Sequence, residues 1–114
     1  ASGLLDWARL DRCREFLRTH AGDHVHSRKL EDIAGMDRFA LARQFRIAFG
    51  TSPHRYQVMR RLEMVKVLIS KGESLAGAAI GSGFSDQSHM ARHFKKAFGM
   101  TPGHWQKLSA VNAA

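Results

Sequence analysis

The sequence predicts an all-α protein made of two similar helical units. Apolar residues recur three or four positions apart along most of the 114 residues, and no stretch alternates apolar and polar residues as a strand does. Apolar residues make up 44% of the chain and charged residues 25%, which is the composition of a folded domain. A segment of the first half is also repeated in the second half. About seven helices are therefore expected.

Three helices are predicted in the first half of the chain. The first one includes Leu10 and ends near Gly22, and a short second one ends at Gly35, because glycine is a common helix terminator. The third begins after Asp37, a residue type that caps helix N-termini, and ends at Gly50. The apolar positions expected to face inward are Leu10, Cys13, Phe16, Leu17, Leu30, Ile33, Ala34, Leu41, Phe45 and Phe49.

Four more helices are predicted in the second half. A long one is expected over residues 53–71, because proline suits the first turn of a helix, and a weak one over residues 74–82. Asp86 caps a sixth helix, and Thr101 and Pro102 begin a seventh. The apolar positions of the long, sixth and seventh helices are Tyr56, Met59, Leu62, Val65, Leu68, Ile69, Met90, Phe94, Phe98, Trp105 and Leu108.

Two segments of the chain are alike when one is shifted by 49 positions. DRFALARQFRIAFGTSPHRYQ, from Asp37, matches DQSHMARHFKKAFGMTPGHWQ, from Asp86. A short helix and a glycine-containing turn precede each segment, so each half has the pattern of a helix-turn-helix unit. The predicted organisation is a first unit at residues 1–50, a linker helix at 51–72 and a second unit at 73–114.

Positive charge is concentrated in the same two segments. The net charge is +8, with six basic residues and no acid from Arg38 to Leu62, and four basic residues and no acid from Gln87 to Ala114. In a helix-turn-helix unit the second helix enters the major groove while basic residues around it contact phosphates. The coincidence of the repeat with the charge therefore predicts binding to double-stranded DNA.

Three motifs are specific enough to suggest a family. They are the repeated R-x-F-[RK]-x-A-F-G-x-[ST]-P blocks, the GFSDQSH segment at 83–89 and the RRL at 60–62. They resemble the DNA-binding domain of the AraC/XylS family of bacterial transcription regulators, over about residues 10–108. The resemblance implies two helix-turn-helix subdomains joined by a long linker helix, with recognition helices in successive major grooves. It also implies RNA polymerase as a partner and, in many members, an upstream domain for effector sensing or dimerisation.

Particular residues match the family's base-facing positions. The spacing agrees for the third helix, because a helix that turns Leu41 and Phe45 inward leaves the arginines of that segment outside. Arginine suits guanine, since its planar fork donates two hydrogen bonds to O6 and N7. Gln87 could pair with an adenine or reach a phosphate. The predicted DNA-binding residues are Arg38, Phe39, Ala42, Arg43, Arg46, Gln87, Ser88, His89, Ala91, Arg92, Lys95 and Lys96.

Five positions depart from the family pattern, and one of them is Ala78, where a larger aliphatic residue is usual. Gly77 and Gly81 each cost about 1 kcal/mol relative to alanine in a helix, so the helix at 74–82 is expected to be the loosest. Ser27 and Glu31 stand where an aliphatic and a small residue are usual. The start of the second helix is therefore not defined by the sequence.

Two other functions stay open: an architectural protein that coats DNA without choosing a sequence, and a helical interaction module whose basic face binds an acidic protein. An enzyme is not expected, because Cys13 belongs to an apolar stripe and no phosphate loop or nucleophile elbow is present. His89 and His93 lie four positions apart, but without a third ligand nearby they are expected to be a surface-facing pair rather than a metal site. No cofactor is predicted.

The chain also lacks a stretch that approaches the roughly 18 apolar residues needed to cross a membrane. The cytoplasm, at the nucleoid, is the expected location. Double-stranded DNA is the expected partner.

Overall fold

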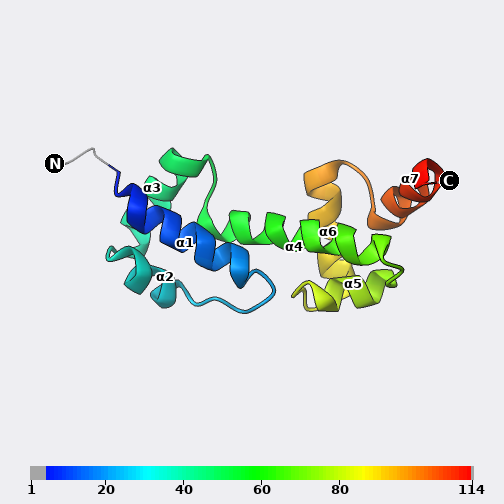
Figure 1. Ribbon diagram of the computed structural model, residues 1–114, viewed down its shortest axis with the longest axis horizontal. Helices are drawn as coiled ribbons and strands as arrows, with labels where there is room; N and C mark the ends of the chain where they lie inside the picture. Colours follow the sequence, from blue (N-terminus) through cyan, green and yellow to red (C-terminus); the bar gives the residue numbers. More distant parts are fainter. Residues whose placement is uncertain (1–4, 114) are drawn as a thin grey trace. The chain divides into compact units, whose positions relative to one another are not determined.

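The computed structural model describes residues 5–113, which form seven α-helices and no strand within that range (Figure 1). The all-α prediction is confirmed. The chain divides into two compact units, Ala1–Gln57 and Val58–Ala114, each with its own core. The helices are α1 (Trp7–Thr19), α2 (Ser27–Ala34), α3 (Arg38–Phe49), α4 (Pro53–Ser70), α5 (Leu75–Gly81), α6 (Gln87–Phe98) and α7 (Pro102–Ala113).

The first unit is built from α1, α2 and α3, which pack on one another in every pairing. Apolar residues repeat at helical spacing on each of them, and burying these stripes against one another excludes water from the core. The core residues are Leu10, Cys13, Leu17, Leu30, Ala34, Leu41 and Phe45. Cys13 illustrates the environment: its burial raises the pKa of the thiol, which lies 3.5 Å from the carbonyl oxygen of Leu30. It is a neutral packing group.

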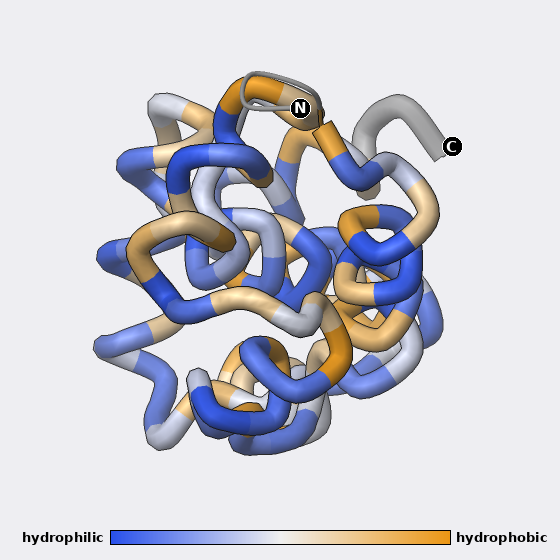
Figure 2. The backbone as a smooth tube through the Cα atoms, turned by 90° about the vertical axis from the view of Figure 1, so that its left-hand side faces the viewer, coloured by the Kyte–Doolittle hydropathy of each residue, from blue (hydrophilic) through white to orange (hydrophobic). Residues whose placement is uncertain are grey.

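The second unit packs most of α4 against α5 and α6, with α7 beside α6. Figure 2 shows hydrophilic and hydrophobic residues following one another along the helical turns, as such packing requires. No helix within residues 5–113 has the length and apolar character needed to span a bilayer. The buried core residues are Val58, Leu62, Val65, Ile69, Ala78, Ala79, Phe84, Met90 and Phe94.

The helix ends largely follow the predicted signals. Asp37 Oδ1 accepts hydrogen bonds of 2.9 Å from the backbone N–H groups of Phe39 and Ala40, and Asp86 Oδ1 accepts one of 2.7 Å from His89. The helix α1 begins three residues before Leu10 and ends before Gly22, and α2 begins at Ser27. Leu108, an apolar residue of the predicted seventh helix, is 43% exposed.

The repeat is visible in the aromatic packing. The ring of Phe45 lies 4.7 Å from that of Phe49 and 6.1 Å from that of Tyr56, measured between centroids. In the second unit the ring of Phe94 lies at the same two distances from those of Phe98 and Trp105. Glycine follows both α3 and α6, and Gly50 and Gly99 share φ 76° and ψ 5°, a left-handed conformation that other residues adopt at a cost.

The register of the repeat changes in the turns that precede α3 and α6. The N–H of Met36 donates to the carbonyl oxygen of Glu31, and in the same pattern the N–H of Phe84 donates to that of Ala79. Each residue of the first hydrogen bond is thus 48 positions before its counterpart in the second, whereas α3 begins 49 positions before α6. The second turn is therefore longer by one residue, and α2 corresponds to α5 under a shift of 48.

Candidate nucleic-acid interface

The outer face of α3 carries the predicted residues of the first unit. The inward positions are Leu41, which is 3% exposed, and Phe45, which is fully buried, whereas Phe39 on the outside is 71% exposed. The division into inner and outer faces that helical spacing predicted is confirmed. The exposed predicted residues are Arg38, Phe39, Ala42, Arg43 and Arg46.

The positive charge on this face is not neutralised by neighbouring acids. Among residues 5–113 no arginine of α3 forms an ion pair with an acid, whereas Arg60 of α4, for example, pairs with Glu63. The guanidinium of Arg38 lies 5.0 Å from the ring centre of Phe39, and its backbone N–H donates to Glu31 Oε1 at 2.8 Å. Glu31 thus fixes the start of α3 through the backbone and leaves the guanidinium charge available. This contact gives a structural role to Glu31, which stands where the family usually has a small residue.

The corresponding face of α6 is basic too, but it differs in detail. Gln87, Ser88, Arg92, Lys95 and Lys96 are exposed. Two further predicted residues, His89 and Ala91, are half-buried. Both units therefore present basic side chains on the helix that follows the turn.

The histidine pair that was expected to face the surface is only partly exposed. His89 and His93 are both half-buried, and their Nε2 atoms lie 3.1 Å apart. Both rings pack near that of Phe84, at 5.6 and 5.9 Å between centroids. The buried phenylalanine of the turn attracts them, which sequence spacing alone does not show. In the part of the chain that the structure describes, no group of three or more His, Cys, Asp or Glu residues is placed to hold a metal ion.

Sequence reasoning missed Gln57, which is buried beside the α1–α2 loop. Its Nε2 donates to the carbonyl oxygens of Ala21, at 3.2 Å, and Asp23, at 2.8 Å. The available signal was its identity with Gln106 in the repeat. By satisfying two loop carbonyls, Gln57 fixes the loop to the beginning of α4.

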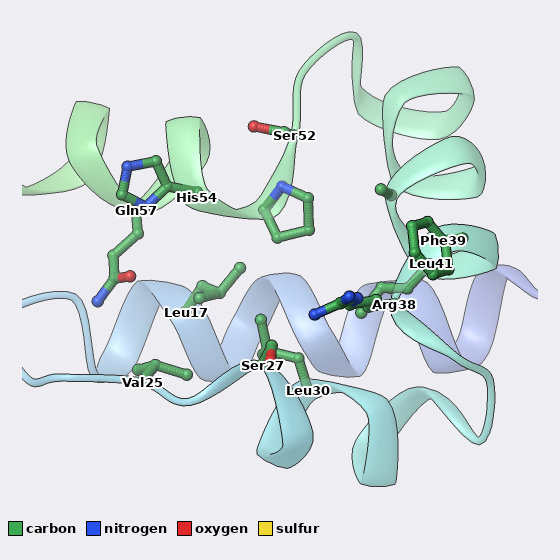
Figure 3. A pocket seen from close by; sticks show the side chains of 12 residues that line it. Leu17, Val25, Ser27, Leu30, Arg38, Phe39, Leu41, Ser52, His54 and Gln57 are labelled. Atoms are coloured by element: carbon green, nitrogen blue, oxygen red, sulfur yellow. The ribbon is translucent and has the colours of Figure 1, made fainter.

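A cavity of about 450 Å³ lies next to the outer face of α3, within the first unit (Figure 3). It is lined by α1, by the start of α2, by the segment that begins α4 and by Arg38, Phe39 and Ala42 of α3. Three predicted DNA-binding residues therefore border a hollow that the sequence did not reveal.

Comparison with known proteins supports the same kind of site. The chain matches a family model described as a helix-turn-helix domain over residues 30–108. It is 36% identical over 76 residues to YbfI of Bacillus subtilis (strain 168), an uncharacterized HTH-type transcriptional regulator; the match covers 67% of this chain and 28% of YbfI. It is 29% identical over 98 residues to the HTH-type transcriptional activator RhaS of Enterobacter sp. (strain 638), covering 83% of this chain and 34% of RhaS. The chain thus spans about a third of the length of these curated relatives.

A solved structure has the same fold. The DNA-binding domain of AdpA, a global transcriptional factor crystallised in complex with a target DNA, superposes with a TM-score of 0.83. The superposition covers 91% of this chain and 95% of the other at 20% sequence identity. This similarity is one of fold.

Proposed function

The chain belongs to the AraC-type family of helix-turn-helix transcription regulators, as a sequence-specific DNA-binding domain, and we propose that the outer faces of α3 and α6 are the surfaces that read the DNA. The observation that carries this proposal is the face of α3, where arginines without acidic partners lie opposite a buried apolar stripe. A basic face on α6, in the repeated unit, supports it.

The proposed roles follow from side-chain chemistry. Arg43 and Arg92 occupy equivalent positions, and each would donate two hydrogen bonds to O6 and N7 of a guanine in the major groove. Phe39, because most of its ring is exposed, would contact a thymine methyl group. Lys95 and Lys96 would contact phosphates, where a flexible point charge suffices.

A competition experiment tests sequence-specific readout. A labelled duplex selected for binding is displaced by increasing amounts of the same duplex or of an unrelated one. We expect the unrelated duplex to compete far less well. Equal competition would indicate an architectural protein, and no duplex binding at physiological salt would indicate a protein-interaction module.

Salt dependence tests the electrostatic part separately. Lysine and arginine side chains on phosphates release condensed counterions, so about six contacts would give a slope near −5 in a plot of log affinity against log salt concentration. A flat response would contradict the role given to the basic faces.

We propose three wider features of the regulator. The first is activation of transcription, which is supported by the RhaS relative being an HTH-type transcriptional activator, with RNA polymerase as the proposed partner. The two helix-turn-helix subdomains are proposed to bind DNA together, connected through residues 51–72. An effector-sensing or dimerisation domain is proposed as a further part of the regulator. The domain is proposed to act without catalysis, in the cytoplasm at the nucleoid, where its DNA partner lies.

A further inference from the structure

The two units differ beside the start of the recognition segment. Under the shift of 48 that the turns establish, Ser27 of α2 corresponds to Leu75 of α5. In the second unit Leu75 Cδ1 lies 3.8 Å from where a Cβ on Gly103 would stand, so its side chain lies against the first turn of α7. In the first unit the short Ser27 lines the cavity of about 450 Å³. The cavity thus lies where the second unit places a leucine side chain.

The lining of this cavity is chemically two-sided. Leu17, Val25, Leu30 and Leu41 give it an apolar wall. Arg38 is the one lining residue that carries a permanent charge, and Figure 3 shows its side chain extending from the start of α3 into the space between α2 and the beginning of α4. A site with an apolar wall and a single charged group has the usual composition of a small-molecule pocket, and its volume is within the usual range.

The guanidinium of Arg38 is exposed and has no anionic partner among the described residues, so its charge is available to a ligand. Among residues 5–113 no carboxylate lies within ion-pair distance of the guanidinium of Arg38. Arginine presents a planar fork whose geometry matches a carboxylate. The equivalent residue in the second unit is Gln87, which has no charge.

We propose that this cavity is a binding site for a small carboxylic acid with an apolar tail. The carboxylate pairs with the guanidinium of Arg38, and the tail lies against Leu17 and Leu30. Because Arg38, Phe39 and Ala42 belong both to the cavity and to the proposed DNA-reading face, an occupied cavity and a bound duplex exclude each other. Only this exclusion rests on the proposed function; the binding site itself does not.

The first experiment uses no DNA. Octanoate is titrated into the whole chain while the methyl resonances of Leu17, Leu30 and Leu41 are followed by NMR. We expect saturable shifts of these methyl groups. Shifts that are absent or confined to other parts of the protein would overturn the proposal.

Variants separate the charge from the apolar wall. Arg38→Gln should weaken octanoate binding about tenfold, the value of one charge-assisted hydrogen bond. Its matched control is Arg12→Gln on α1, which removes the same charge away from the cavity and should leave binding unchanged. Ser27→Leu gives the first unit the residue of the second and should abolish the shifts while the fold is kept. Octanol, which lacks the charge, should bind about tenfold more weakly than octanoate; equal binding would overturn the role of Arg38.

The second experiment tests the exclusion. Octanoate should displace a bound duplex from the unmodified protein and fail to displace it from Ser27→Leu. If the methyl groups respond to octanoate but the duplex stays bound, the exclusion is overturned and the site stands. If no duplex binds at all, the proposed function fails, and the NMR titration still decides the carboxylate site.

Discussion

The two helical units have separate cores that are built alike, and they differ mainly at their surfaces. Phe45 and Phe94 hold equivalent aromatic neighbours at matching distances, and aspartate and glycine begin and end both recognition segments. The differences lie around the turn and on the outer helix face. Arg38 of the first unit corresponds to Gln87 of the second, and Ser27 to Leu75. The aromatic core and the helix ends are thus alike in the two units, whereas Arg38 and Ser27, which line the cavity of the first unit, have different counterparts in the second.

The largest effect on stability is expected from substitutions in the two equivalent cores. Phe45→Ala and Phe94→Ala should each lower the free energy of unfolding by about 3–5 kcal/mol, because each leaves a cavity in a filled core. The loss should be confined to the unit that carries the substitution. Urea unfolding can report each unit separately, through Trp7 in the first and Trp105 in the second, with the other tryptophan replaced by phenylalanine. Equal loss in both units after either substitution would contradict the assignment of two cores.

A smaller effect is expected at a buried position that differs between the units. The hydroxyl of Ser82 is fully buried without a hydrogen-bond partner among the described residues, whereas its counterpart in the first unit is the buried Ala34. Ser82→Ala should therefore raise the free energy of unfolding of the second unit by about 1 kcal/mol. Ala34→Ser is the matched reverse substitution and should lower that of the first unit. Unfolding followed by circular dichroism measures both, and a loss of stability in Ser82→Ala would contradict this account.

The smallest effect concerns the glycine-rich helix α5. Gly77→Ala should stabilise the second unit by about 0.5–1 kcal/mol, because alanine restricts the unfolded chain and favours a helix. Its Cβ would stand 2.7 Å from Glu73 Oε2, the end of an exposed side chain that can move aside, and 3.1 Å from Ser74 Oγ, the capping hydroxyl of α5, which would have to shift slightly. Gly81→Ala is the control, since there the Cβ would meet Leu68 Cδ1 at 3.0 Å, the end of a half-buried side chain that packs against the core, and the gain should be smaller. Thermal unfolding distinguishes them, and a larger gain from Gly81→Ala would reverse the argument.

Local signals explain how much of the fold could be predicted. A cap such as Asp37 and a terminator such as Gly50 act on their own helix ends, and an apolar stripe reveals which face is buried, so the helices and the exposed arginines could be derived from sequence. Contacts between distant segments could not. The carboxylate of Glu31 reaches the N–H of Arg38 only after the turn has formed. Likewise, Gln57 lies 34 positions or more from the carbonyl groups it binds.

The candidate site shows the same limit. Spacing placed His89 on the helix surface, and packing against Phe84 draws it partly inward. The cavity beside α3 depends on a short side chain, because Ser27 occupies the position that Leu75 has in the second unit. The sequence shows that Ser27 departs from the family pattern, but it does not show that a cavity results. The extra residue in the second turn was hidden because the repeat resumes in register at Asp86.

We propose that the equivalent arginines Arg43 and Arg92 read guanines at two different positions of one DNA site. The most direct measurement is the selection of bound duplexes from a random library by the unmodified domain, by Arg43→Ala and by Arg92→Ala. The account predicts an asymmetric site, with each variant losing its preference at one position, and a different position for each. Arg12→Ala, on the exposed side of α1, should select the same site as the unmodified domain. If both arginine variants keep the full preference and only bind every sequence more weakly, the arginines contact phosphates alone and the claim is contradicted.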